Sequence, residues 1–365
     1  MNGCRACGKS EMSRVLDLGR MPAADFFPPA TDPVRTEEAS HALAMDLCHA
    51  CGLAQLADDD TTTDEPRGVE PQALKDQAEA AIAQVAADGW LRGDTVLEFG
   101  SPHGGTWVPL LAERGFTSVA SSPADVVLDC FGIMHEPNQG SAFERRAELT
   151  RAGGVLLLQY HSLATIVAKG QWNALRHGHF AYYSLTTLTR LLDQVGMRIV
   201  TAWEFDLYGG TVLLAAVHGT AAEPDESVLR ILAAEHALGV TDPTAVGELQ
   251  HSADRHIGSL RCWLQEEAQA GHTVLAYGAA SRAVALFSGA GIDSRLLAAV
   301  ADASPAKQGR RMPGTDIPIV APDELLSAKP DWVLLTLPDL LPEISARFPE
   351  LDGRWKVDGQ WLARD

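Results

Sequence analysis

Thr95-Val-Leu-Glu-Phe-Gly100-Ser-Pro-His-Gly-Gly-Thr106 joins a short apolar run to a glycine-rich turn. The run has the length of a buried β-strand, and a helix is expected to follow over 107–115. A strand, an acidic residue and a glycine turn before a helix suit a nucleotide-type ligand lying over the strand ends. A tight turn with no ligand also favours glycine, so this motif alone leaves both interpretations open. Glu98, Gly100 and Gly104 are the residues expected to contact such a ligand.

Strand-like and helix-like segments alternate on both sides of this turn. Apolar runs predict strands over 124–128, 154–159, 197–203 and 212–217, and apolar periodicity predicts helices over 72–87, 141–151 and 185–195. Alternation at this spacing is typical of a mostly parallel sheet covered by helices. Residues 72–220 are therefore expected to form one α/β domain.

A second α/β unit is expected towards the C-terminus. Residues 221–270 have a polar helical pattern, and His272-Thr-Val-Leu-Ala-Tyr-Gly278 then repeats the strand and glycine turn, with further strands expected over 296–300, 317–320 and 332–337. A glycine turn that opens a helix can receive a phosphate, and Lys307, Arg310 and Arg311 would add positive charge. A solvated basic loop explains the same residues. The connector and second unit together span 221–365.

Four of the six cysteines form two close pairs at the N-terminus, Cys4-Arg-Ala-Cys7 and Cys48-His-Ala-Cys51. Two such pairs complete a tetrahedral Cys4 shell for zinc, and a closed shell of this kind is structural. Four unligated thiols in a turn-rich segment are the alternative. The sequence predicts a zinc-binding domain over 1–57, followed by an acidic linker over 58–70.

The formal net charge of −19 opposes general binding to nucleic acid or to an anionic membrane. It leaves room for a small phosphorylated ligand in a local basic pocket. No signal peptide or membrane-spanning run is recognised, so a cytoplasmic enzyme is expected, with its oligomeric state undetermined.

Titratable residues gather in the segment Trp172-Asn-Ala-Leu-Arg-His177-Gly-His179-Phe-Ala-Tyr182-Tyr183-Ser184. Histidine is the natural general base near neutral pH. The alternative is a pair of packing or surface histidines beside packing tyrosines.

Taken in this order, the motifs resemble the deoxysugar C-methyltransferases that act on nucleotide-linked ketosugars. The cysteine pairs and Leu16-Asp-Leu-Gly19 resemble the zinc-binding segment of that family. His179-Phe-Ala-Tyr182-Tyr183-Ser184-Leu resembles its catalytic stretch. Tyr208-Gly-Gly-Thr211 and Lys307-Gln-Gly-Arg310 resemble its later motifs.

The resemblance implies a small zinc-binding domain followed by two Rossmann-like domains. It also implies that S-adenosylmethionine is the methyl donor. A base removes the acidic proton next to the carbonyl of a 4-ketosugar, and the enolate carbon attacks the methyl group. By the same resemblance His179 is the base, His135 contacts the substrate, and His177 is a further catalytic residue.

The remaining site residues also follow from the resemblance. Tyr182 and Tyr183 would orient the sugar or simply pack. The C-terminal unit would hold the nucleotide diphosphate, with Tyr277, Lys307 and Arg310 among the substrate-binding residues.

The chain departs from the family pattern in several places. Arg176-His177-Gly178-His179 stands where the family has Tyr-His-Glu-His, and Pro102-His103 replaces a polar pair in the donor turn. Ser118-Val-Ala-Ser-Ser122 offers no carboxylate for the ribose of the donor. A strand and helix that usually wrap the adenine are expected to be missing.

Three functions therefore remain open. The first is a methyltransferase that uses S-adenosylmethionine. The second is a donor-independent enzyme that shifts a proton, such as an epimerase, isomerase or cyclase. The third is a non-catalytic partner of a true methyltransferase.

Overall fold

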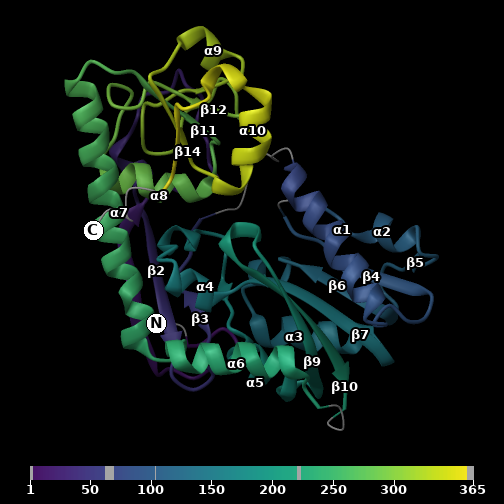
Figure 1. Cartoon of the computed structure of the whole chain (residues 1–365). Coiled ribbons are helices and arrows are strands. Elements are labelled where there is room, and N and C mark those ends of the chain that lie inside the picture. The colour runs from purple at the N-terminus through teal and green to yellow at the C-terminus, as the bar shows by residue number, and fades with distance from the viewer. Residues whose placement is uncertain (1–2, 62–69, 103, 220–222, 360–365) are drawn as a thin grey trace.

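Three β-sheets organise the chain in the computed structural model, which describes residues 3–61, 70–102, 104–219 and 223–359. Their strand orders are β1-β2-β3-β8, β5-β4-β6-β7-β10-β9 and β13-β12-β11-β14-β15. Each sheet is built from one region of the sequence, except that β8 of the N-terminal sheet comes from the histidine segment. This mixed α/β architecture agrees with the fold class expected from the sequence (Figure 1).

The six-stranded sheet comes from the middle of the chain and is called the central sheet below. Its strands are β5 (Thr117–Ser118), β4 (Thr95–Phe99), β6 (Ala124–Cys130), β7 (Thr150–His161), β10 (Thr211–His218) and β9 (Met197–Phe205). The first four run parallel, and β10 lies antiparallel between β7 and β9. The sheet ends at β5, a strand of two residues, and only five residues separate it from β6. The sheet thus has no strand beyond β5 in the described part of the chain, as the sequence predicts.

Helices cover both faces of this sheet. Helices α1 (Gln72–Ala87) and α2 (Val108–Ala112) pack on one face, and α3 (Gln139–Leu149) and α5 (Leu185–Gln194) pack on the other. Side chains along a strand alternate between the faces, so Val126 contacts the first pair of helices and Val127 the second. The observed bounds of α1 are those expected from its periodicity, and α2 is shorter than expected.

The N-terminal region contains a long hairpin that the sequence analysis did not anticipate. Its strands are β1 (Met12–Met21) and β2 (His41–Cys48), followed by β3 (Ala54–Leu56). The N-terminal region therefore contains regular strands in addition to the turns expected from its sequence. Leu43, Met45 and Leu47 alternate along β2 and are buried, which is the period-2 pattern of a strand.

The C-terminal sheet is entirely parallel. Its strands are β11 (Val274–Tyr277), β12 (Val300–Ala301), β13 (Ile319–Val320), β14 (Trp332–Leu335) and β15 (Trp355–Val357), and its helices include α8 (Ser281–Ala290), α9 (Glu324–Ala328) and α10 (Leu341–Arg347). The strand expected over 296–300 is reduced to β12, because most of that run forms the turn that follows α8. Short 3-10 helices lie at Thr36–Glu38, Ile133–His135, Trp172–Ala174, Leu207–Gly209, Pro338–Leu340 and Pro349–Leu351.

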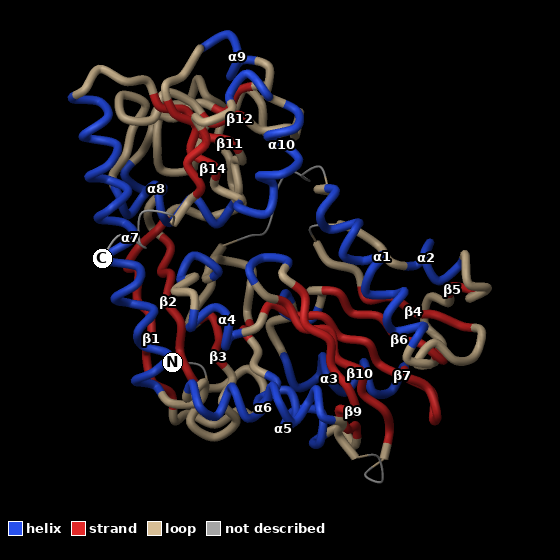
Figure 2. The backbone as a smooth tube through the Cα atoms, viewed as in Figure 1, coloured by secondary structure: helices blue, strands red, loops and turns tan. Residues whose placement is uncertain are grey.

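Helix α7 (Pro243–Gln269) ties the parts of the chain together. It follows α6 (Glu226–Leu238) and runs beside β1 along one side of the molecule, up to the C-terminal sheet (Figures 1 and 2). Its buried residues join those of the hairpin and of α8 in one continuous core. Among the described residues no helix has the length and apolar character needed to cross a membrane. The predicted linker lies largely outside the described residues.

A buried ion pair fixes the turn that follows β6. Asp129 accepts hydrogen bonds from the backbone N–H groups of Gly132 and Ile133. Its other carboxylate oxygen lies 2.7 Å from the guanidinium of Arg146, and both side chains are at most 1% exposed. Because His135 follows directly, this network helps to position one of the candidate site residues.

We expect Arg146→Ala to destabilise the protein by about 3–5 kcal/mol, because Asp129 would keep a buried charge without its partner. Arg145→Ala removes the neighbouring exposed arginine and should cost about 1 kcal/mol or less. Urea unfolding of both variants measures the difference. Equal stability of the two variants would contradict the role given to the pair.

Candidate functional site

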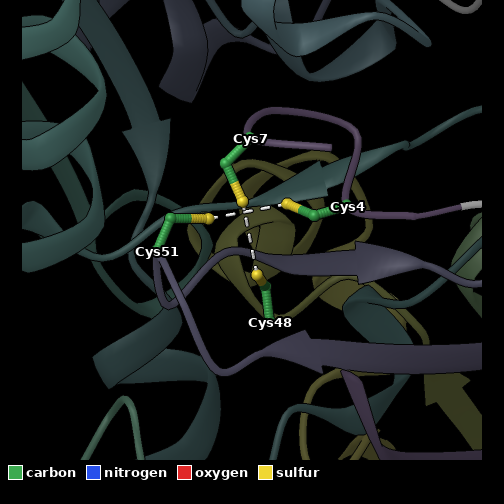
Figure 3. A group of neighbouring side chains, drawn as sticks. All are labelled: Cys4, Cys7, Cys48 and Cys51. Carbon is green, nitrogen blue, oxygen red and sulfur yellow. Dashed lines mark hydrogen bonds between the residues drawn. The ribbon is translucent and has the colours of Figure 1, made fainter. Parts of the chain in front are cut away.

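The four paired cysteines converge on one point (Figure 3). All four Sγ atoms lie within 4.8 Å of one another, and the closest pairs are Cys4–Cys51 at 3.5 Å and Cys7–Cys48 at 3.6 Å. A tetrahedral zinc–thiolate centre with Zn–S bonds of about 2.3 Å requires sulfur–sulfur distances of about 3.8 Å. The cysteine residues therefore fit a zinc ion as a closed, structural shell.

Local backbone turns explain why both pairs take this shape. Gly8 donates to the carbonyl of Cys4 and Gly52 donates to the carbonyl of Cys48, both at 2.9 Å. The two glycines have φ values of 70° and 80°, which are readily adopted only without a Cβ. Strand β3 begins directly after the second turn, so the metal site and the N-terminal sheet share their backbone.

The N-terminal sheet continues into the histidine segment. Strand β8 (Ala181–Tyr182) pairs antiparallel with β3, through Ala54 with Tyr182 and Gln55 with Ala181. Leu56 also donates to the carbonyl of Phe180 at 3.2 Å. The zinc-binding segment thus holds the chain just beyond His179.

A cavity of about 310 Å³ lies between the carboxyl ends of the central strands and the C-terminal domain. Ser101, Phe131 and His161 line it from the loops after β4, β6 and at the end of β7. Gly278 and Ser281 line it from the C-terminal domain. Open α/β sheets bind ligands at this edge, so this cavity is the candidate active site.

His135 and His179 meet in this cavity. Their ring centroids are 4.4 Å apart and the rings lie edge to face at 76°. Nδ1 of His135 donates to the carbonyl of Gly178 at 2.9 Å. Nε of Arg176 donates to Nδ1 of His179 over a longer 3.4 Å. These contacts order the two imidazoles with respect to each other.

His177 lies outside the cavity, contrary to its expected catalytic position. Its Nε2 donates to the carbonyl of Ala42 on β2, and its ring contacts His41. Burial is the main cause that lowers its pKa, so the ring is neutral near pH 7. Gly178 separates the two histidines with a φ of 77° and donates to Asp59 Oδ2, a turn that directs His177 and His179 apart.

The two adjacent tyrosines also separate. Tyr182 lines the cavity, and its hydroxyl accepts a hydrogen bond from the backbone N–H of Arg176 at 3.1 Å. Tyr183 points to the other side of the strand, where its hydroxyl donates to Gln139 and its ring packs on Phe143. Tyr183 is therefore a packing residue, and its expected contact with substrate does not follow from the structure.

Of the three basic residues Lys307, Arg310 and Arg311, only Lys307 lines the cavity. Lys307 lines the cavity, with Nζ donating to the carbonyl of Ala279 and lying 4.6 Å from the ring centre of Phe27. Arg310 does not line it, because its guanidinium donates to the carbonyl of Phe27 and ties down the N-terminal segment. Arg311 is buried against Glu38. Tyr277 lines the cavity as expected.

Several cavity residues were not among the predicted site residues, and those with polar or charged side chains include His161, Arg176, Tyr208 and Arg282. The position of His161 at the carboxyl end of a buried strand was a signal that could have found it. Burial, followed by the charge of Arg282, lowers its pKa to about 3, so His161 is neutral near pH 7. Arg282 follows the glycine turn of the second α/β unit, and Arg176 lies in the histidine segment itself.

The glycine-rich turn after β4, where the methyl donor is expected, borders two cavities. Glu98, Gly100 and Gly104 line a second cavity of about 40 Å³, which is smaller than the roughly 300–1,000 Å³ of ligand pockets. Ser101, Pro102 and Gly104 of the same turn also line the first cavity. Glu98 already accepts hydrogen bonds from Thr106 and from the backbone of Trp107. With no strand beyond β5 and no carboxylate at its end, the described residues do not enclose the adenosine part of S-adenosylmethionine. His103 lies outside the described residues.

Fold and site together define a protein with a zinc-binding segment and two Rossmann-like units that enclose a histidine-containing cavity. Residues 4–62 match the family described as "Putative zinc binding domain", and residues 206–361 match the family described as "C-methyltransferase C-terminal domain". The second match begins before residue 221, where the sequence pattern places the boundary.

C-methyltransferase NovU of Streptomyces niveus is 25% identical over 400 residues, which cover 97% of this chain and 94% of NovU. The chain is therefore similar to the C-methyltransferases, with matches at both its zinc-binding and its C-terminal regions.

Two solved structures are similar to part of this chain. An O-methyltransferase family protein from Burkholderia thailandensis is 14% identical with a TM-score of 0.32, over 40% of this chain and 57% of that chain. Magnesium protoporphyrin IX methyltransferase from Synechocystis PCC 6803, solved with bound SAH, is 14% identical with a TM-score of 0.30, over 40% of this chain and 84% of that chain.

Removal of the metal with a chelator is expected to loosen the active-site segment, because the pairing of β3 with β8 rests on the cysteine turns. Hydrogen–deuterium exchange of peptides that contain Phe180–Tyr182 should become faster in the metal-free protein. Cys262→Ser, which removes an exposed thiol outside the cluster, is the control and should leave exchange unchanged. Unchanged protection after complete metal removal would show that the segment is held independently.

Proposed function

We propose that this protein removes an acidic proton from the carbon next to the carbonyl of a keto substrate. The substrate would be a nucleotide-linked ketosugar or a related keto compound, and the reaction would take place in the cavity between the two α/β domains. The pairing of His135 with His179 in that cavity is the observation that carries this proposal. The family relationship supports it, since carbon methylation requires a carbon nucleophile such as an enolate.

The hydrogen bonds of His135 and His179 indicate which ring nitrogen carries the proton in each, and therefore a different role for each residue. A carbonyl oxygen only accepts, so Nδ1 of His135 carries a proton and Nε2 of the neutral ring keeps a lone pair. Arginine only donates, so Nδ1 of His179 accepts and its neutral ring carries the proton on Nε2. His135 is therefore the better proton acceptor, and His179 is placed to donate a hydrogen bond to the substrate carbonyl. This exchanges the roles that the family resemblance implies.

The first candidate for the complete reaction is carbon methylation, which the family relationship favours. S-adenosylmethionine supplies the methyl group in that reaction. The second candidate is a donor-independent proton shift, such as an epimerisation or isomerisation. The 40 Å³ cavity beside Glu98 and the lack of a strand beyond β5 among the described residues favour this second candidate. Both begin with the same proton removal.

Proton removal is tested by incubating the zinc-loaded protein with a nucleotide-linked 4-ketosugar in deuterium oxide and following the loss of proton signal by NMR. His135→Gln and His179→Gln should each slow the exchange by about 100-fold or more. His251→Gln, an exposed histidine on α7, is the matched control and should exchange at the wild-type rate. Exchange that survives both cavity substitutions would sink the proposal.

Calorimetric titration with S-adenosylmethionine and S-adenosylhomocysteine separates the two candidate reactions. Micromolar binding of either compound would assign methyl transfer. No binding up to millimolar concentration, with the protein shown to be folded, would assign the donor-independent reaction. If the protein neither binds these compounds nor exchanges a substrate proton, it is a non-catalytic partner.

A further inference from the structure

We propose that the keto substrate carries an oxyanion, a carboxylate or a phosphate attached to its own skeleton, which binds between Arg176 and Arg282 beside the histidine pair. This inference rests on the proposed function and narrows its substrate class. Both arginines line the cavity, one from the histidine segment and the other from α8 of the C-terminal domain.

Contacts hold the two guanidinium groups in place without neutralising them. Arg176 donates to the hydroxyl of Ser281 at 2.6 Å and to His179. Arg282 lies 5.5 Å from the ring centre of Tyr208. In the described parts of the chain neither guanidinium has a carboxylate oxygen within 4.0 Å, so neither is part of an ion pair.

The electrostatics of the cavity agree with an anion site. The pKa of Arg282 is lowered, first by burial and then by the charge of Arg176. The same two charges add to the effect of burial on the pKa of His161. Partly buried like charges that repel each other cost free energy in the free protein, and a bound anion would offset that cost.

Two of the carboxylates near the cavity accept hydrogen bonds from backbone N–H groups. Asp302 accepts hydrogen bonds from the N–H groups of Ala279 and Ser304. Asp339 accepts from the N–H of Tyr208, and its charge acts on Arg282 from beyond ion-pair distance. The other carboxylates to consider are Glu70 and Glu343, which line the cavity, and Asp358, which pairs with His256.

The sequence of the histidine segment also favours an anion site. Arg176 and Gly178 occupy positions where the family pattern has tyrosine and glutamate. Each replacement makes the segment more positive by one charge, immediately beside His179. A cavity of about 310 Å³ lies at the lower end of the range for ligand sites. A compact keto acid or keto phosphate therefore suits both its charge and its size.

Calorimetry of the full zinc-loaded chain at fixed ionic strength tests the subsite. The probes are 2-oxobutyrate, inorganic phosphate and the neutral ketone 2-butanone. Wild-type protein should bind at least one of the two anions, and bind it more tightly than 2-butanone. Whichever anion binds more tightly and displaces the other identifies the group as carboxylate or phosphate.

Arg282→Gln and Arg176→Gln should weaken anion binding by about 10- to 100-fold, the size of a charge-assisted contact. Arg282→Lys keeps the charge and should lose less, which guards against a general folding defect. Arg295→Gln is the matched control, since its side chain is 87% exposed on the surface. Wild-type affinity in Arg282→Gln, or no anion binding by the wild-type protein, would overturn the proposal.

His179→Gln separates this inference from the proposed function. It should bind the anion probes while losing proton exchange. Proton exchange by a protein that binds neither anion would overturn the oxyanion subsite alone. Anion binding without exchange of any keto compound would overturn the proton removal alone.

Discussion

The pairing of β3 with β8 is the contact on which the arrangement of the site depends. Two residues of the histidine segment extend a sheet whose other strands are built around the cysteine cluster. A segment that would otherwise be a surface loop therefore gains the backbone hydrogen bonds of a strand. A zinc ion in the closed cysteine shell would take no part in the chemistry, but it would help to fix the position of His179 through this pairing.

The cavity needs both α/β units. The central sheet contributes His135 and His161 from the ends of its strands, and the C-terminal domain contributes Arg282 and the start of α8. Helix α7 and the N-terminal hairpin hold these units together through one continuous core. The proposed anion site joins the two units, with Arg176 next to His179 and Arg282 on the C-terminal domain, and would hold a keto compound beside the histidine pair.

Local patterns in the sequence were sufficient for much of the fold. The two cysteine pairs predicted the metal cluster, because each pair is closed by its own turn. Helix α1 has its expected bounds, and the strands of the central sheet fall where apolar runs placed them. These features depend on neighbours within a few residues, which the sequence shows directly.

The directions of individual site residues depend on contacts with distant parts of the chain, so they could not be predicted from local sequence patterns. His177 and His179 are two residues apart, yet a glycine with positive φ and a contact with Asp59 place them on different sides of the segment. Lys307 and Arg310 share one loop, but only Lys307 lines the cavity. The side chain of Arg310 instead donates a hydrogen bond to the carbonyl of Phe27 in the N-terminal segment.

A crystal structure of the zinc-loaded protein with bound 2-oxobutyrate would show whether the two arginines bind the anion while the histidine pair faces the reacting carbon. We expect the carboxylate between Arg176 and Arg282, with the carbon next to the carbonyl facing His135 and His179. A ligand bound in the smaller cavity beside Glu98, or turned so that its carboxylate meets neither arginine, would contradict it.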